Sequence, residues 1–442
     1  MYKILALLLC LTYVTALEKV NNQLINKNVE RSIDLTTQLV KITSTITLEN
    51  TGRESVRNFL LVLEPNTVGN VSYSNVKDSL KDDLKIVRIE VDNQKDKTFY
   101  NVLLKQPLDA GRVTTVVLEE VLTKSLIPFP SSITQKEKQL KTEVSLSSRT
   151  VENYTKLKPV VQSDSTITYG PYGTIQPFTQ DEMIIHYENN APFLTVTRLE
   201  RSIEISHWGN IAVEENIQIR HTGAKLKGPF SRYDYQRDTG TAHHSIKSYR
   251  TILPASAHSV YYRDSNGNIS TSTVRPRKEW IELELRPRFP LFGGWQSSYT
   301  LGYSVPSYQY LFKNPSGEYV LNMRIIDHVF DDMHVEELET AIVLPVGVSD
   351  IKLNTPYEVE RLGDEITYKY LDNIGRTVIK LRKTNLVEQH IQDLEITYNW
   401  KPHLLLHEPI LLSIALFLSF VCVIIYVRLD FSLSKSEHSK KE

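Results

Sequence analysis

The stretch LVKITSTITL, residues 39–48, alternates apolar and polar side chains along most of its length. Alternation with a period of two, in a run rich in Ile and Thr, is typical of a half-buried antiparallel β-strand. Similar patterns bounded by turn-forming residues recur at 210–219, 280–285 and 365–370. Residues 135–142 are polar and are either a short surface helix or a loop. The body of the chain is therefore predicted to be mainly β.

The first half of the chain resembles the second half. Residues 30–35 read ERSIDL and residues 200–205 read ERSIEI, and each is followed, after an alternating stretch, by Thr-Gly. Two further pairs match in compatible order: DAG at 109–111 with FGG at 292–294, and DEMIIHYENN at 181–190 with DEITYKYLDN at 364–373. Several ordered matches favour a duplicated domain. We predict two tandem β-sandwich-like domains, at residues 17–190 and 191–403.

The bulk composition excludes several classes of protein. A chain of 442 residues, 41% of them hydrophobic, is long enough for two or three domains with buried cores. Its formal net charge of -1 provides no global field that would attract nucleic acid. The two cysteines, Cys10 and Cys422, lie outside both predicted domains, which excludes disulfides and thiolate chemistry from the body.

An uncharged apolar run, residues 410–427, lies near the end of the chain. As a helix it spans roughly 27 Å, close to the hydrocarbon core of a bilayer. Arg428 and three lysines follow, so the positive-inside rule places residues 428–442 in the cytosol. Residues 1–16 have the basic start, apolar stretch and small-residue cleavage pattern of a signal peptide. We predict a single-pass type I protein, anchored by residues 404–427, with its bulk on the exported side.

Three small residues in the predicted membrane helix, Ala415, Ser419 and Cys422, are spaced i, i+4 and i+7 and share one face. Small faces let helices pack closely in lipid, so this face is predicted to contact a partner helix. The alternative is a plain lipid-facing anchor with scattered small residues. Trp400 and Tyr426 are predicted to lie near the two membrane interfaces.

The sequence contains no His-Glu-x-x-His, no Gly-x-Ser-x-Gly and no phosphate-binding glycine-rich loop. The best candidate metal ligands lie close together in the sequence and are His328, Asp331, His334, Glu336, Glu337 and Glu339. Their types suit a divalent metal, but an acidic loop between strands explains the same residues. We therefore predict no catalytic residue, no cofactor and no metal site.

A second charged cluster surrounds Trp280 and consists of Arg275, Arg277, Lys278, Arg286 and Arg288. Strand alternation divides such charges between two faces, so we interpret the cluster as a solvated sheet face. A patch for lipid phosphates or partner subunits is the alternative.

Three Asn-X-Ser/Thr sequences have no proline at the middle position, and they begin at Asn70, Asn153 and Asn268. The predicted topology exports all three, and each lies beside turn-forming residues. We predict that at least two of them carry a glycan.

Long, irregular strings in the second half and the anchor resemble the ribophorin I family, the large single-span subunit of eukaryotic oligosaccharyltransferase. These strings are GPFSRYDYQ (228–236), VYYRD (260–264), RPRFPLFGGW (286–295), DHVFDD (327–332), NLVEQHIQD (385–393) and YVRLDFSL (426–433). The resemblance covers most of residues 199–433, and the first half resembles the family more loosely. About fifteen residues follow the apolar run, which is similar to the short-tailed fungal form.

The resemblance implies an endoplasmic reticulum membrane protein with two luminal β-rich domains. It implies membership of the complex that transfers an oligosaccharide from dolichol diphosphate to Asn in Asn-X-Ser/Thr. In that family catalysis belongs to a separate multi-span subunit, and this subunit presents nascent polypeptides and holds the complex together. The implied partners are therefore that catalytic subunit, small membrane subunits, substrate polypeptides and the membrane, with no nucleic acid.

Two other classes of protein fit part of the pattern. A membrane-anchored adhesion or receptor protein also carries tandem β-domains, although an exported body without cysteine is unusual at a cell surface. A membrane-anchored hydrolase with an unrecognised site is the third hypothesis.

Overall fold

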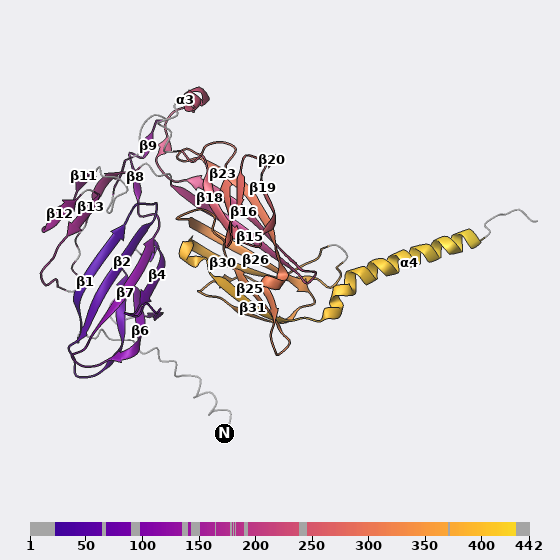
Figure 1. The fold of residues 1–442 in the computed structure, drawn as a ribbon, viewed down its shortest axis with the longest axis horizontal. Helices are drawn as coiled ribbons and strands as arrows, with labels where there is room; N and C mark the ends of the chain where they lie inside the picture. Colours follow the sequence, from indigo (N-terminus) through magenta and orange to yellow (C-terminus); the bar gives the residue numbers. More distant parts are fainter. Residues whose placement is uncertain are drawn as a thin grey trace, which may run out of the picture.

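The structure is a computed structural model of the chain. It describes residues 23–63, 68–89, 98–134, 140–142, 151–163, 165–176, 179, 181, 183–189, 193–237, 245–369 and 372–429. Two β-rich bodies lie side by side, and one long helix leaves the second body (Figure 1). We call the body formed by residues up to 189 domain 1 and the body formed by residues 193–399 domain 2. The boundary at residue 190 and the signal peptide stay predictions, because both lie outside the described residues.

Domain 1 is built on two antiparallel sheets that pack face to face. The first has the order β1 (Leu24–Asp34), β2 (Val40–Asn50), β7 (Val113–Leu122) and β4 (Val71–Lys77). The second has the order β3 (Val56–Leu63), β6 (Thr98–Leu108) and β5 (Lys85–Ile89). Apolar residues from both sheets form one core, including Leu48, Phe59, Val76, Val102 and Val116. This arrangement is a β-sandwich.

A smaller sheet and a hairpin complete domain 1. The sheet has the order β11 (Val151–Tyr154), β14 (Ile185–Glu188), β10 (Leu140–Thr142) and β8 (Ile127–Phe129), and the hairpin joins β12 (Val160–Ser163) to β13 (Thr166–Tyr169). Ile185 and Tyr187 of β14 pack in a second core with Leu35 and Val40. Residues 140–142 thus form a strand, and neither predicted alternative is correct there, because β14 and β8 pair with both edges of β10. Residues 135–139 lie outside the described residues.

Domain 2 contains one nine-stranded sheet. Its order is β20 (Gly267–Asn268), β19 (His258–Asp264), β23 (Gln296–Pro306), β16 (Asn210–His221), β15 (Leu194–Ser206), β26 (His334–Val346), β30 (Arg376–Val387) and β28 (Glu360–Arg361), with β29 (Glu365–Thr367) also paired to β30. Most pairs are antiparallel, but β15 and β26 are parallel. These two long strands lie at the centre of the sheet and are far apart in the sequence.

Two smaller sheets pack against this large sheet. One has the order β18 (Tyr249–Pro254), β22 (Trp280–Leu285) and β21 (Thr273–Pro276), and the other has the order β24 (Leu311–Lys313), β25 (Tyr319–Arg324), β31 (Asp393–Asn399) and β27 (Ser349–Asn354). All three sheets contribute to one continuous core, in which Ile203, Leu283 and Ile396 are buried. Short helical segments α3 (Arg232–Arg237), η2 (Ser307–Gln309) and η3 (Glu388–His390) lie between strands.

The predicted mainly β class with two sandwich-like domains is confirmed. The four alternating stretches coincide with β2, β16, β22 and β29, although β29 ends at Thr367 rather than at residue 370. Each long alternating strand points its apolar residues into a core, as the burial of β16 shows with its strict alternation of buried and partly exposed positions.

The two domains share an arrangement of three neighbouring strands. Strands β1, β2 and β7 are neighbours in domain 1, as β15, β16 and β23 are in domain 2. The amide of Gly111 donates to Asn50 O at 2.7 Å, and the amide of Gly294 donates to His221 O at 2.8 Å at the equivalent corner. Both glycines have positive φ, of 71° and 84°. These equivalent corners support the duplication.

The last predicted pair of matching stretches has no such equivalence. Residues 181–190 contain β14, which pairs with β10 and β11 in a small sheet. Residues 364–373 contain β29, which pairs with β30 at the edge of the large sheet.

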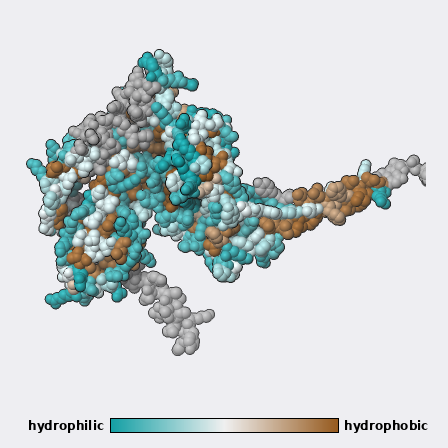
Figure 2. All heavy atoms as spheres, in the orientation of Figure 1, coloured by the Kyte–Doolittle hydropathy of each residue, from teal (hydrophilic) through white to brown (hydrophobic). Residues whose placement is uncertain are grey.

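An apolar helix, α4 (His407–Arg428), follows the short segment η4 (Pro402–Leu406). It contains the predicted run 410–427 and is long and apolar enough to cross a membrane. Hydrophobic residues cover it along its length, whereas the body has a mixed surface (Figure 2).

Candidate functional site

The two domains meet at a junction with an apolar centre. Leu39 and Val121 of domain 1 and Val387 of domain 2 are buried together, with Tyr73 of β4 packed against them. The rings of Tyr73 and His390 meet in a T-shaped arrangement at a centroid distance of 6.0 Å. Burial of apolar side chains from both domains opposes their separation.

Asn385, near the end of β30, connects the polar part of the junction. Its side-chain Oδ1 accepts from Thr123 Oγ1 at 2.6 Å, and its Nδ2 donates to Val71 O at 3.3 Å. Its backbone O accepts from Ser72 Oγ at 2.6 Å. His334 of β26 contacts the same Oδ1 from within domain 2, at 3.2 Å from its Nε2. Asn385 has φ +58°, a conformation that asparagine tolerates better than most residues.

Ion pairs surround this junction. Lys41 Nζ lies 2.5 Å from Asp332 Oδ1, and Gln38 Nε2 donates to Asp332 O at 2.7 Å. On another side, Lys124 Nζ lies 2.9 Å from Glu336 Oε1. Each charged pair joins one domain to the other, so the contact surface combines apolar burial with directional polar contacts.

A second crossing joins the domains through their backbones. Strand β9 (Ser132–Ile133) of domain 1 pairs in parallel with β17 (Lys225–Leu226) of domain 2. Gly293 packs so closely behind this pairing that an added Cβ would overlap the carbonyl oxygen of Ala224. Two separate crossings restrain rotation of one domain against the other more than either crossing alone.

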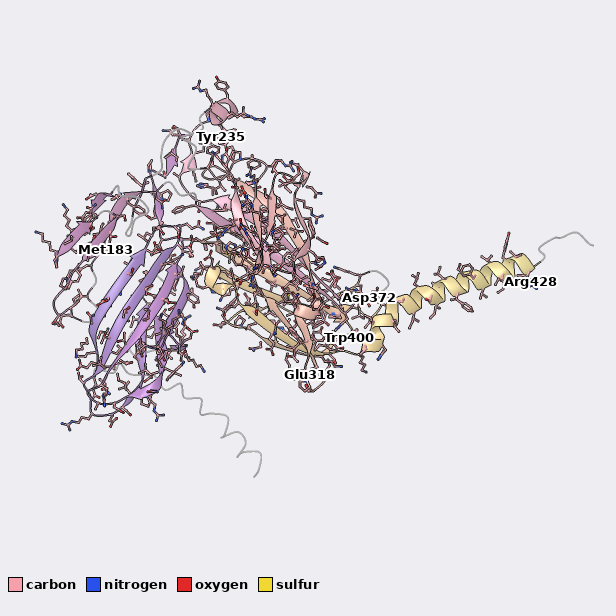
Figure 3. All side chains as sticks on the ribbon, in the orientation of Figure 1. Met183, Tyr235, Glu318, Asp372, Trp400 and Arg428 are labelled. Atoms are coloured by element: carbon pink, nitrogen blue, oxygen red, sulfur yellow. The ribbon has the colours of Figure 1, made fainter. Side chains whose placement is uncertain are left out.

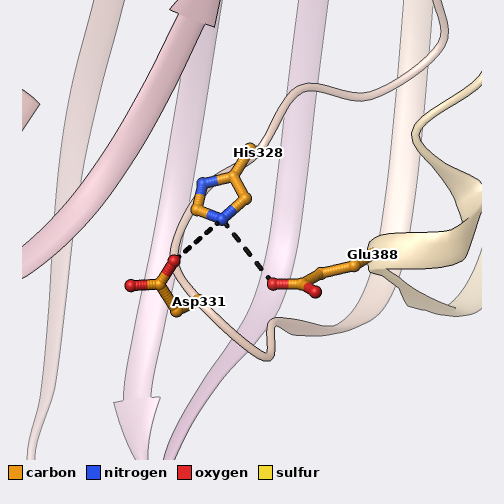
Figure 4. Close-up of side chains that lie close together, drawn as sticks. All are labelled: His328, Asp331 and Glu388. Carbon is orange, nitrogen blue, oxygen red and sulfur yellow. Dashed lines mark ion pairs between the residues drawn. The ribbon is translucent and has the colours of Figure 1, made fainter. Parts of the chain in front are cut away.

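His328, Asp331 and Glu388 form a charged cluster beside the junction (Figure 4). His328 Nε2 lies 3.3 Å from Asp331 Oδ1 and 3.6 Å from Glu388 Oε1. These three residues have the donor types that a divalent cation accepts. However, Arg250 binds Asp331 through two nitrogens, and the amide of Asp332 donates to Glu388 Oε1 at 2.6 Å. We interpret the cluster as a group of ion pairs whose charges are neutralised by neighbouring groups of the protein. The cluster orders the loop that carries Asp332.

The candidate metal ligands from the sequence are only partly brought together. His328 and Asp331 do meet, but His334 is buried in β26 against Asn385, and burial lowers its pKa to about 4. The three glutamates form separate ion pairs, Glu336 with Lys124, Glu337 with Arg382 and Glu339 with Arg198. Glu388 was not among the candidates, because it follows β30, far away in the sequence. The hydrogen bond from His328 lowers the pKa of Glu388.

A buried ionic network lies in the core of domain 2. The Arg201 side chain of β15 is fully buried and pairs with Glu215 and, at 2.7 Å, with Asp327 Oδ2. The Tyr303 hydroxyl donates to the same Asp327 oxygen. Burial raises the pKa of Glu215 to about 7, although Arg201 favours its charged form. Sequence reasoning assigned these residues no role, although Arg201 lies in the repeated ERSIEI and Asp327 in DHVFDD.

The connection between domain 2 and α4 is rigidly attached to the body. The Trp400 ring stacks on the His207 ring at 3.8 Å, and Trp400 Nε1 donates to Val346 O at 3.0 Å. Glu408, in the first turn of α4, lies 3.5 Å from Arg376 Nη2. Trp400 therefore packs on the base of domain 2, where its indole N–H is bonded to the protein, and its place near a membrane interface stays a prediction.

The remaining predicted residues occupy three kinds of place. Asn153 on β11 and Asn268 on β20 are exposed, whereas Asn70 is half-buried next to the junction. Ala415, Ser419 and Cys422 are exposed on α4.

Four of the basic residues around Trp280 form ion pairs. These pairs are Arg275 and Arg277 with Glu282, Arg286 with Glu284 and Arg288 with Asp264.

Together, the tandem β-sandwiches, the double junction and the single apolar helix define a membrane-anchored protein with a two-domain β body. The family model for ribophorin I matches residues 24–427, which include both domains and α4. The chain belongs to the ribophorin I family.

Named relatives are similar over nearly the same length. Dolichyl-diphosphooligosaccharide–protein glycosyltransferase subunit 1 of Caenorhabditis elegans is 40% identical over 428 residues, which cover 92% of this chain and 72% of the relative. Subunit 1B of the same enzyme from Arabidopsis thaliana is 36% identical over 434 residues, which cover 92% of this chain and 93% of the relative.

Proposed function

We propose that this chain is a non-catalytic subunit of oligosaccharyltransferase in the endoplasmic reticulum membrane. That complex transfers a preassembled oligosaccharide from dolichol diphosphate to Asn in Asn-X-Ser/Thr of nascent polypeptides. The observation that carries the proposal is the similarity to relatives named subunit 1, which extends over most of the chain, including both domains and α4. The double junction and the fixed base of α4 suit a scaffold, because they hold a large body in one orientation above its anchor.

Purification in mild detergent tests this function. We expect the chain to co-purify with a multi-span transferase and small hydrophobic subunits, and we expect its depletion to reduce N-glycosylation of other secreted proteins. Solitary migration together with normal glycosylation would contradict the proposal and favour a free-standing adhesion or receptor protein.

The proposed topology is type I, with both domains in the lumen and residues 428–442 in the cytosol. Within the membrane, the small-residue face of α4, formed by Ala415, Ser419 and Cys422, is proposed to pack against a helix of another subunit. These side chains are exposed along α4 and are therefore available to a partner.

The double substitution Ala415→Leu with Ser419→Leu is expected to weaken co-purification of the catalytic subunit, because two leucines would hold a partner helix away from this face. The matched control is Phe417→Leu with Ile424→Leu, which changes exposed positions on the opposite face of α4. Membrane insertion of both variants is checked by protease protection. Undiminished co-purification of the first variant would reduce α4 to a simple anchor.

The role in substrate presentation is proposed for the edge of domain 1. Strand β1 is the end strand of its sheet in the part of the chain that the structure describes, and most of its residues are exposed. An exposed edge pairs with an extended peptide through backbone hydrogen bonds, largely independent of the side chains of that peptide.

Photo-crosslinking tests this edge. A photoreactive residue in place of Val29 on β1 is expected to capture acceptor peptides in the intact complex. The same residue in place of Thr43, which is exposed but lies on the inner strand β2, is the matched control and is expected to capture fewer. Equal capture at both positions, or capture only on other subunits, would contradict presentation by β1.

The exposure of two of the three sequons predicts their modification. Asn153 and Asn268 are expected to carry glycans, which endoglycosidase treatment would reveal as a mobility shift lost in Asn153→Gln and Asn268→Gln. At Asn70 the sequon hydroxyl, Ser72 Oγ, is bonded to Asn385 O across the junction. Modification there is expected only before the domains dock, so a junction variant such as Asn385→Ala should raise its occupancy. An unchanged mobility after endoglycosidase treatment of the wild type would contradict the prediction.

A further inference from the structure

The base of domain 2 is fixed around the start of α4. Trp400 is bonded to Val346, the last residue of β26, and Leu404 of η4 packs over Gly347 in the turn that follows. Arg376, at the start of β30, reaches Glu408 of α4. Trp400 and Asp372 both lie at the end of domain 2 from which the helix leaves (Figure 3). The turns at this end are therefore held close to the first residues of the helix.

Large apolar side chains protrude from these turns. Trp208, in the turn between β15 and β16, is 67% exposed, and Tyr308 of η2 is 73% exposed. The two segments are neighbours, because the amide of Ser307 donates to Gly209 O at 3.0 Å. His207, next to Trp208, is the residue that stacks on Trp400. This first group therefore lies directly beside the connection to α4.

A second group lies around Gly375, on the Arg376 side of the connection. Ile366 and Tyr368 pack over Gly375, and both are more than 60% exposed, at 63% and 61%. Ile374 is also exposed, and its turn is ordered by Asp372, whose Oδ1 accepts from the amides of Ile374 and Gly375. These side chains are held outward by a structured turn.

The chain itself places both groups near the bilayer. The uncharged run begins at Ile410, two residues after Glu408, which is about 3 Å farther along a helix axis. The interfacial layer on each side of the hydrocarbon is roughly 5–8 Å thick, so residues packed beside Glu408 lie within or next to it. Trp and Tyr favour this layer, because the ring enters the apolar region while the N–H or O–H stays hydrated.

We propose that the base of domain 2 rests on the membrane, with Trp208, Tyr308, Tyr368 and Ile374 inserted among the lipid headgroups. This proposal depends on the proposed function, in which α4 spans the membrane. The membrane contact fixes the tilt of the body, because the two groups of anchors lie on either side of the end of β26, where the connection to α4 is attached, and therefore resist rocking about a single point. Both the edge of β1 and the junction would then keep a constant height above the bilayer.

Quenching of tryptophan fluorescence by lipid tests this surface. The full chain is reconstituted in phosphatidylcholine vesicles that contain lipids brominated near the headgroup. Of the four tryptophans, Trp208 is expected to supply more than half of the quenched signal, so Trp208→Phe should remove that share. Trp280→Phe is the matched control, because Trp280 is partly exposed on β22 and belongs to neither group.

Equal quenching in wild type and Trp208→Phe would overturn the proposal. Protection of Trp208 from aqueous iodide in the purified complex but not in vesicles would also overturn it, because another subunit would then cover this surface. Alkaline carbonate extraction separates these results from a failure of the proposed function. Release of the chain by carbonate would contradict the span of α4 itself, and the membrane contact would fall with it.

Discussion

Replacing Arg201 with leucine is expected to lower the free energy of unfolding by about 3–5 kcal/mol. The substitution leaves Glu215 and Asp327 buried in the core of domain 2 without the cation that compensates both. Burial of uncompensated carboxylates is costly, and protonation of Glu215, whose pKa is already raised to about 7, relieves only part of that cost. Thermal unfolding of the full chain in detergent, followed by intrinsic fluorescence, measures the change.

Arg198→Leu is the matched control for this substitution. Arg198 lies on the same strand, but it is exposed and pairs with Glu200 on the surface. An exposed pair contributes about 0–1 kcal/mol, so the control should unfold close to the wild type. A variant in which Arg201, Glu215 and Asp327 are all replaced by apolar residues should regain part of the lost stability, because no charge is then left unpaired. Equal stability of Arg201→Leu and Arg198→Leu would contradict the importance of the network.

The duplication explains why the sequence predicted the strands but not this network. Arg31 in ERSIDL is paired across β1 and β2 with Ser44, and Arg201 in ERSIEI is paired across β15 and β16 with Glu215. The two arginines thus occupy the same place in the same hairpin. Arg31 is exposed on an edge strand, whereas β15 is an inner strand and the Arg201 side chain is buried against Asp327 and Tyr303. The local pattern is the same in both copies, and contacts with residues far away in the sequence decide the burial.

The junction shows the same limit of local patterns. The strings DHVFDD and NLVEQHIQD were informative about the family, but their contact with domain 1 depends on how β26 and β30 are placed in the large sheet. Asp332 and Asn385 have left-handed backbones that direct their polar groups toward Lys41 and Thr123. Alternation along a strand predicts which face is buried but not which other domain covers the end of that strand. The apolar helix was predictable because length and lack of charge suffice for it.

Acidification is expected to destabilise the junction between about pH 6.5 and pH 4. The pKa of His334 and the pKa of His390 are lowered from 6.5 to about 4, chiefly by burial. The charge of Lys124 contributes to the shift at His334 and that of Lys383 to the shift at His390, while Glu336 opposes the shift at His334. The unfolded chain therefore takes up protons as the pH falls through 6.5, whereas the folded chain does not until about pH 4. Stability from these histidines is complete above pH 6.5 and is lost progressively below it, by roughly 3 kcal/mol for each histidine, at about 1.4 kcal/mol per unit of pKa.

The double variant His334→Gln with His390→Asn isolates this effect. The glutamine amide can still reach Asn385, and the asparagine oxygen can still accept from the amide of Val387, as His390 Nδ1 does. Glu215 responds to pH in the opposite direction, because a raised carboxyl pKa favours the folded state as the pH falls, so only the difference between wild type and variant is diagnostic. The melting temperature should fall more steeply in wild type than in the variant between pH 6.5 and pH 4, and His258→Gln, at an exposed position, should follow the wild type. Parallel profiles for wild type and double variant would contradict a junction stabilised by two neutral, buried histidines.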